Sequence, residues 1–451
     1  MHEVITISVG PHANNIVTHF NNLQEDKLYL APSLAQNPID PNVHMEPVAE
    51  GSSYTFYPRT VHWEYQNGYG ALAQFGVENV DKTGYEVVEQ PRVEKNKYQE
   101  LLDSAQPTKS VLETDRVRYW TDFTRVLYKP RALLSIRNWE YDYKSQVGFL
   151  KMHPERKFEG YDVGAAEYKS QPDFVDETLR QTTERCDLVN GMNLVTEVDS
   201  AWGGFSDELL ADIRDEYAKT SVLTWSLTRD TERLSFERLI SRIRASVGLM
   251  RNSSLYLPLS TTPPLPKWAD AADLWHVSSI QCIPLEFVNG LFAAKPALLI
   301  ADFVNGLSTT RGQNVVWDIT SAPHVFSCRQ AYGNKGDHYF AQTAITRGAA
   351  TKVDFSSLIT NGTPTRHSVQ YHSSVAFNSS LDSFPSAFSK EEGRTPSLCT
   401  LGVTNAPRSW FKHMAALVSR HYRGDEREEL KNELETMGEQ YVWGYESDDD
   451  Y

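Results

Sequence analysis

One stretch in the middle of the chain constrains the fold more than any other. LVNGMNLVTEV at 188–198 is apolar enough to be a buried strand, and DSAWGGFS at 199–206 has the composition of a turn. DELLADIRDEYA at 207–218 repeats its leucines and isoleucine at helical spacing, and TSVLTWSL at 220–227 is a second strand. A strand, turn, helix and strand in this order form the unit of a parallel sheet with helices on its faces. The segment therefore predicts the α/β class.

The N-terminus shows the same alternation. Residues 3–9 alternate as a strand does, Gly10 and Pro11 turn the chain, and the following residues place apolar side chains at helical spacing. PRTVHW at 58–63 predicts a further strand, and 173–186 predicts an amphipathic helix with an acidic first turn.

The chain is expected to divide into several parts. Residues 1–257 are predicted to form the N-terminal domain, with a long irregular insertion near 31–53 and a second insertion near 85–116. Within the second insertion, residues 90–107 are expected to form a solvated loop or a short surface helix. A Pro-rich segment begins a second α/β or α+β domain over 258–405, in which PALLIADFV and NVVWDI are expected strands. A C-terminal helical segment follows at 406–445, and the acidic tail 446–451 is expected to be disordered.

Charge and motifs exclude several classes of function. The chain has 44 Lys and Arg against 59 Asp and Glu among 451 residues, a balance that argues against direct binding of nucleic acid. It contains no Walker A loop, HExxH helix or GxSxG elbow. Its four cysteines have no zinc or disulfide-framework spacing, which favours a reducing compartment. No segment has the composition of a membrane span, and the first residues lack the features of a mitochondrial matrix presequence.

Four segments carry a resemblance to a known family. ERCDLVNGMNLVTEVDSAWGGFSDELLADIRDEY resembles the tubulin segment that contains the glycine-rich phosphate loop. EVITISVGPHANNIV, PRTVHWE and RNWEYDYK resemble the first strand and loop, a later strand with its acidic end, and the Asn-Trp loop of tubulins, in the same order. The resemblance implies a tubulin-like N-terminal domain. The phrase TEVDSAWGGF, the opening MHEVITI and the insertion after the first helix resemble the fungal branch of the Misato family.

This resemblance implies a cellular role. Misato-type proteins are implicated in mitochondrial distribution, morphology and inheritance of mitochondrial DNA, at the mitochondrion or in the cytoplasm. The expectation is a peripheral protein on the cytosolic face, acting through protein partners that are cytoskeletal or belong to the outer membrane. Two alternatives stay open, namely a GTP-binding assembly protein and a cytosolic scaffold or chaperone cofactor for cytoskeletal proteins.

The resemblance also assigns a nucleotide site. The positions that correspond to the GTP site of the family are Gly10, Asn14, Glu64, Asn138, Gly203 and Gly204. At positions next to these, the residues differ from those of the tubulin family. Pro11 stands where the family has a Gln, Trp202 interrupts the glycines, and Asp199 adds a negative charge.

Catalysis is therefore not expected. Tubulin-like polymers use an Asn-x-acid motif of one subunit to complete the active site of the next, and after residue 220 this chain has neither Asn-x-Asp nor Asn-x-Glu. The sequence predicts a degenerate site with no cofactor, no metal and no catalytic residue, and GTP binding is the alternative.

Overall fold

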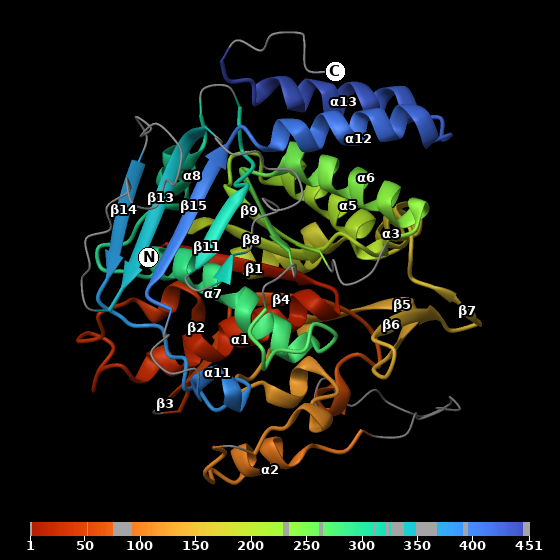
Figure 1. The fold of residues 1–451 in the computed structure, drawn as a ribbon. Helices are drawn as coiled ribbons and strands as arrows, with labels where there is room; N and C mark the ends of the chain where they lie inside the picture. Colours follow the sequence, from red (N-terminus) through yellow and green to blue (C-terminus); the bar gives the residue numbers. More distant parts are fainter. Residues whose placement is uncertain are drawn as a thin grey trace.

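The larger of two main sheets forms the centre of the molecule (Figure 1). The computed structural model describes residues 2–51, 53–74, 93–109, 111–228, 234–260, 265–309, 312–321, 324–325, 338–348, 368–390 and 396–444. Within these ranges the larger sheet has eight strands in the order β10-β9-β8-β1-β4-β5-β6-β7. Their bounds are β1 Glu3–Val9, β4 Thr60–Gln66, β5 Leu133–Asp142, β6 Val147–Leu150, β7 His153–Lys157, β8 Val189–Glu197, β9 Val222–Thr228 and β10 Leu255–Ser260.

The strands from β10 to β5 are parallel, and β6 and β7 continue the sheet antiparallel. Every residue of β1 is buried, as expected for a strand covered by helices on both faces. Figure 1 shows α1 and α7 on one face and α3, α5 and α6 on the other, with α12 and α13 outside α5 and α6. The bounds of these helices are α1 Pro11–Asp26, α3 Tyr161–Lys169, α5 Ala201–Glu216, α6 Phe236–Asn252, α7 Leu274–Phe292, α12 Pro407–His421 and α13 Arg427–Gln440.

The second sheet has the order β12-β11-β15-β13-β14, and β2 and β3 form a separate hairpin. These strands are β2 Met45–Glu50, β3 Ser53–Pro58, β11 Asp318–Ser321, β12 His324–Val325, β13 Tyr339–Arg347, β14 Ser368–Ser373 and β15 Leu398–Thr404. The remaining short helices are η1 Lys27–Tyr29, η2 Pro41–Val43, η3 Gly70–Gln74, α2 Lys97–Asp103, η4 Thr114–Arg116, η5 Trp120–Phe123, η6 Pro130–Ala132, η7 Val175–Leu179, α4 Arg180–Thr183, α8 Ile300–Leu307 and α11 Ser386–Lys390.

The α/β class, the predicted N-terminal strand and helix, and the strands β4, β8 and β9 are confirmed. The turn predicted at 199–206 is wrong, because α5 already begins at Ala201 with Ser200 as its cap. The strand expected in PALLIADFV is also wrong, since its second half forms the short amphipathic helix α8. An apolar run of this length fits either element, and only its packing decides between them.

Two further expectations need correction. The insertion near 31–53 is not irregular throughout, because it contains η2 and the first strand of a β-hairpin. The helix predicted at 173–186 is shorter and consists of a π-helical turn followed by α4. In the second insertion, α2 is the short helix that was allowed for, and its Tyr98 is buried. Residues 85–92 and the tail 446–451 lie outside the described residues.

A buried group of three charges connects the two sheets. Glu286 of α7 pairs with Lys27 at the end of α1 and with Arg347 of β13, whose Nη1 lies 2.9 Å from the carboxylate. Their side chains are at most 7% exposed. Burial acts to raise the pKa of Glu286, but Arg347 and Lys27 outweigh it, so this pKa lies below its ordinary value. The carboxylate is therefore charged and pairs with two cations that are almost completely buried.

We expect Glu286→Gln to lower the free energy of unfolding by about 3–5 kcal/mol, because it leaves two buried cations without a counter-charge. Urea denaturation measures this. Glu435→Gln, at a half-exposed position of α13, is the control and is expected to change the value by less than about 0.5 kcal/mol. Equal stability of the two variants would contradict a structural role for the buried group.

Candidate functional site

The predicted nucleotide positions lie mainly at the carboxyl ends of β1, β4 and β8. Gly10 follows β1, Glu64 lies in β4, and α1 and α5 begin at the same edge. In open parallel sheets, ligands bind outside this edge, and helix N-termini there attract anions. A phosphate group in this fold would therefore be sought here.

Asn14 is occupied entirely by contacts inside the protein. Its Nδ2 donates to the Trp63 carbonyl oxygen at 3.0 Å and to Glu64 Oε2 at 2.8 Å. Its Oδ1 accepts from Ser8 Oγ at 2.6 Å and lies 2.8 Å from His62 Nδ1. Two donors and two lone pairs are all that an amide has. Asn14 has no hydrogen-bonding capacity left for a ligand.

Glu64 is fully buried and surrounded by donors. Besides Asn14, its carboxylate accepts from Trp120 Nε1 at 3.1 Å and from the Tyr65 backbone N–H at 2.9 Å. Burial raises the pKa of Glu64 from 4.5 to about 8; the donors oppose this shift, and the nearby Glu197 carboxylate adds to it. The acid is therefore mainly protonated at pH 7, whereas binding of a metal–phosphate group favours a carboxylate.

Trp202 fills the space next to Gly10. The indole has no exposed surface, and its centroid lies 4.9 Å from that of Tyr65 and 5.0 Å from that of Phe158. Gly10 has a φ of 90°, and a Cβ added to it would lie 2.8 Å from the indole and from a Glu197 oxygen. Glycine is required here because the indole and a carboxylate approach the backbone closely.

Gly203 and Gly204 lie inside helix α5 and not in a loop. A Cβ on Gly204 would lie 2.1 Å from the Tyr161 carbonyl oxygen, and one on Gly203 would lie 2.7 Å from the Ala245 Cβ. Gly164 of α3 meets the Ala201 carbonyl oxygen in the same way, at 1.6 Å. These glycines allow α3 and α6 to pack closely against α5.

The first amides of α5 are already satisfied. The backbone N–H of Ala201 donates to the Phe158 carbonyl, Trp202 N–H donates to Ser200 Oγ, and Gly203 N–H donates to the Ser200 carbonyl, at 3.3, 3.3 and 3.1 Å. These are the donors that a helix N-terminus would offer to an anion. Here they are used within the protein.

Asn138 and Asp199 lie at the margin of the site. Asn138 is exposed in β5, where the register against β4 is interrupted, and its side chain contacts Glu167. Asp199, whose charge the sequence placed at the mouth of a loop, is buried and pairs with Arg242 at 2.5 Å. The structure brings Gly10, Asn14 and Glu64 together but leaves Asn138 outside this group.

Three residues of the site were missed by sequence reasoning, namely Trp120, His62 and Glu197. Trp120 stacks on His62 with centroids 4.6 Å apart, and it comes from a segment that carried no signal beyond its composition. His62 and Glu197 lie inside segments that resemble tubulin, so their positions in strands were available from the sequence. The sequence did not indicate that these two side chains lie at the site.

Among the described residues, one small cavity lies at this edge of the sheet. A cavity of about 30 Å³ lies beside Pro11, Asn15 and Trp275. A small-molecule pocket usually measures roughly 300–1,000 Å³, and a single water takes about 30 Å³. In the described ranges, no group of three or more His, Cys, Asp or Glu side chains is arranged to hold a metal ion, and no helix is long and apolar enough to cross a bilayer.

Comparisons with known proteins agree with this architecture. Residues 2–104 match the model of the Misato Segment II tubulin-like domain, and residues 109–291 match that of a tubulin domain. The chain is 30% identical to Protein DML1 of Yarrowia lipolytica, over all of this chain and 99% of the relative. It is 29% identical to Protein DML1 of Eremothecium gossypii and 28% identical to Protein dml1 of Aspergillus niger, with the same coverage.

The packing role of the α5 glycines leads to a first prediction for this site. Gly204→Ala is expected to destabilise the protein by about 1–3 kcal/mol, because the added methyl group overlaps the backbone of α3. Gly306→Ala in α8, where nothing lies closer than 3.9 Å, is the control and is expected to stabilise by up to about 1 kcal/mol. Urea unfolding compares the two variants. Unchanged stability of Gly204→Ala would contradict the packing role.

Glu64 leads to a prediction for pH dependence. Because its folded-state pKa of about 8 exceeds its unfolded value, the folded chain retains a proton that the unfolded chain releases. The contribution of this group to stability is therefore complete below pH 4.5 and falls by roughly 1.4 kcal/mol per pH unit as the pH rises toward 8.

Glu64→Gln removes this contribution to the slope. The variant is expected to be less stable overall, because its amide N–H₂ faces one of the three donors, but its stability should fall less steeply between pH 5 and 8 than that of the wild type. Urea unfolding at a series of pH values gives both slopes. Parallel slopes would show that Glu64 is ionised throughout.

Proposed function

Since this chain belongs to the Misato/DML1 family of tubulin-like proteins, we propose that it acts without catalysis, through protein partners, in the distribution and morphology of mitochondria and the inheritance of mitochondrial DNA. Its proposed place is the cytosolic face of the mitochondrion and the cytoplasm, and its proposed partners are cytoskeletal or outer-membrane proteins. The mitochondrial part rests on the family resemblance alone.

The observation that supports the non-catalytic part is the position of Trp202. The indole is fully buried against Gly10, at the helix N-termini where a tubulin-like fold would hold phosphates. A triphosphate does not fit these residues. Its oxygens would compete with the indole for space, and they would approach the Glu197 carboxylate beside Gly10 in a setting of low dielectric.

The amides of the site point to the same proposal. Phosphate loops bind by offering several free N–H groups, whereas the first amides of α5 donate to Phe158 and Ser200. Pro11 has no N–H to offer at the start of α1. A ligand at these amides would therefore have to break contacts that the fold already makes.

Nucleotide binding tests the non-catalytic part directly. The purified chain, mixed with a fluorescent GTP analogue and magnesium, is expected to show no saturable binding up to about 100 μM, because the cavity at this edge is too small. Phosphate release from GTP is expected to stay at the level of a buffer blank. Micromolar binding that unlabelled GTP displaces, together with turnover, would favour the alternative of a GTP-binding assembly protein.

A cellular test addresses the mitochondrial part. In a fungal host deleted for its own family member, mitochondria are expected to cluster and mitochondrial DNA to be lost, and this chain is expected to restore both. Glu64→Gln should restore them equally if it accumulates to the same level, because no metal–phosphate group depends on that acid. Normal mitochondria in the deleted host would refute the mitochondrial role.

Affinity purification from the same host separates the remaining alternative. The proposal expects mitochondrial outer-membrane or cytoskeletal proteins among the captured partners. Recovery of chaperonin and tubulin chains without mitochondrial proteins would instead favour a cytosolic scaffold or chaperone cofactor.

A further inference from the structure

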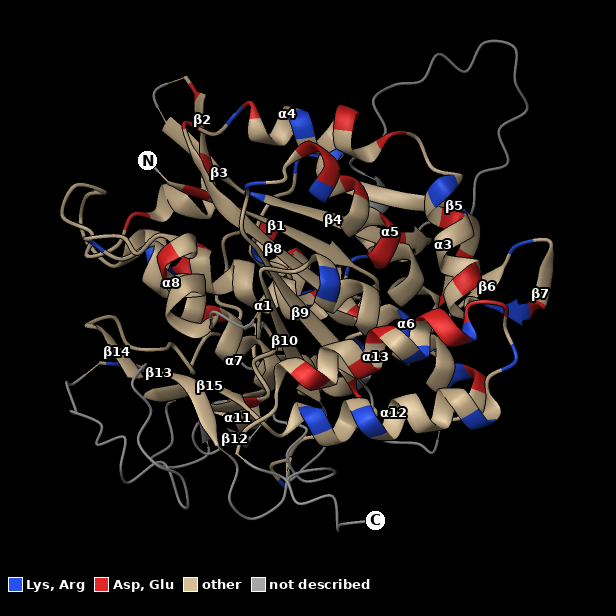
Figure 2. Cartoon of the chain, turned by 90° about the horizontal axis from the view of Figure 1, so that it is seen from above, with Lys and Arg blue, Asp and Glu red and all other residues tan. Residues whose placement is uncertain are grey.

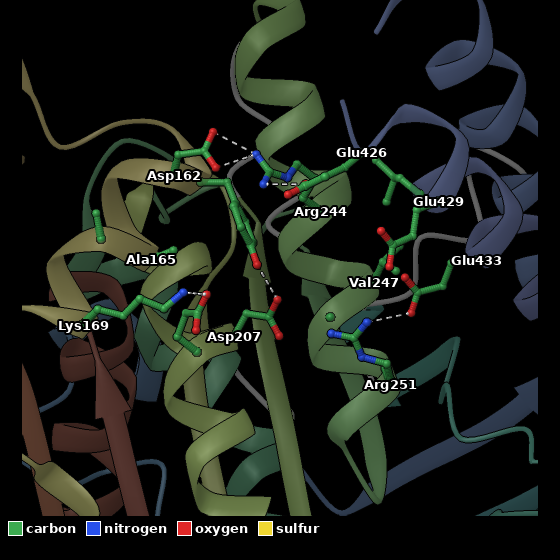
Figure 3. Close-up of a pocket in the computed structure, with 15 residues that line it drawn as sticks. Asp162, Ala165, Lys169, Asp207, Arg244, Val247, Arg251, Glu426, Glu429 and Glu433 are labelled. Carbon is green, nitrogen blue, oxygen red and sulfur yellow. Dashed lines mark hydrogen bonds and ion pairs between the residues drawn. The ribbon is translucent and has the colours of Figure 1, made fainter. Parts of the chain in front are cut away.

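An open cleft of about 440 Å³ lies on the outer side of the molecule, beside the middle of α5. Figure 3 shows its walls, which come from α3, α5, α6 and the C-terminal helix α13. In the view of Figure 2, α13 lies beside α6 and carries several acidic positions. Nothing in the predicted nucleotide site contributes to this cleft.

The cleft is lined by more carboxylates than cations. The acidic side chains are Asp162, Asp207, Glu208, Glu426, Glu429 and Glu433, and the basic ones are Lys169, Arg244 and Arg251. Each cation is already paired within the cleft: Arg244 with both Asp162 and Glu426, Arg251 with Glu433, and Lys169 with Glu208. The surplus is therefore negative, and in the described residues Glu429 has no ion partner.

Asp207 at the floor of the cleft has an unfilled acceptor. Its side chain belongs to a residue that is only 6% exposed, and Oδ2 accepts from the Tyr161 hydroxyl at 2.7 Å. Its Oδ1 is buried and has no hydrogen-bond partner among the described residues. Gly248 leaves the space for this carboxyl group, since a Cβ there would lie 2.0 Å from it.

An unpartnered buried carboxylate oxygen is costly. A buried acceptor without a donor costs about 1–3 kcal/mol, and more if it is charged. Burial raises the pKa of Asp207 to about 6, so the group is mostly ionised at pH 7 although it is poorly solvated. A cationic donor entering the cleft would satisfy the oxygen and stabilise the charge at the same time.

We propose that this cleft binds an arginine-containing basic segment of a protein partner, with one guanidinium reaching Asp207. Arginine matches the site because its planar fork donates to a carboxylate through two N–H groups and loses little hydration on burial. The existing Arg244 shows the same preference, since it stacks on the Tyr161 ring at 4.1 Å and bridges two acids.

The spacing on α13 favours a peptide over a single small cation. Glu426, Glu429 and Glu433 recur at helical spacing on one face, and at 1.5 Å per residue they extend over about 10 Å. That length matches about three residues of an extended chain. One arginine of the segment would then contact Asp207 at the floor of the cleft, and a further basic side chain would contact Glu429. This interface is separate from the proposed loss of nucleotide binding and stands or falls independently of it.

Peptide binding to the full chain tests the proposal. The probe is a fluorescein-labelled heptapeptide with four arginines, and its control carries citrulline, an uncharged isostere, at the same positions. Fluorescence anisotropy is expected to detect the arginine peptide and not the citrulline peptide. Asp207→Asn is expected to raise the dissociation constant about tenfold, and Glu429→Gln about threefold, since each removes one charged acceptor.

Glu435→Gln is the matched control, because Glu435 lies on the same helix and does not line the cleft. Its dissociation constant is expected to stay within about twofold of the wild type, and circular dichroism and thermal unfolding establish that all three variants are folded. If Glu429→Gln and Glu435→Gln weaken peptide binding equally, the peptide binds the acidic surface non-specifically and not in the cleft. The proposal would be overturned if Asp207→Asn left the dissociation constant unchanged or if the citrulline peptide bound with equal affinity. It would also be overturned if spermine competed for the cleft as effectively as the unlabelled arginine peptide.

Discussion

The close contact between helices α3 and α5 is the constraint on which the other features depend. Gly164 meets the carbonyl of Ala201, and Gly204 meets the carbonyl of Tyr161, so backbone packs against backbone without side chains between them. This approach fixes the first turn of α5 against the sheet and holds Trp202 beside Gly10. Glycines that would be read as a phosphate loop thereby serve packing, and the same two helices form one wall of the outer cleft.

Three buried carboxyl groups show how surroundings decide the state of an acid. Glu286 lies between Lys27 and Arg347, which hold its pKa below the ordinary value in spite of burial. Glu64 has only neutral donors around it, and burial prevails, so its pKa rises to about 8. Asp207 is intermediate, with one hydroxyl donor and one empty acceptor. Glu286 is charged and Glu64 is neutral because Glu286 has cations beside it, and the number of hydrogen bonds does not decide this difference.

The sequence predicted the repeated strand–helix units well, because periodicity and resemblance agreed there: β1, α1, β4, β8 and β9 all formed as expected. It failed where an element depends on a distant partner. Gly203 and Gly204 looked like a turn, since the pattern contains no information about α3, and α8 looked like a strand because a short apolar run fits both. Pro11 and Trp202 led the sequence to predict a degenerate nucleotide site, but the hydrogen bonds that saturate Asn14 and the first α5 amides could be known only from the structure.

Helix α5 contributes both to the edge of the sheet where Trp202 is buried and to the outer cleft. Trp202 and Asp207 are five residues apart, which at 100° per residue places them about 140° apart around the helix axis. The helix therefore presents an indole to the sheet and a carboxyl group to the cleft. Trp202 and Asp207 thus lie on two sides of one packed helix, the first against the sheet and the second at the cleft.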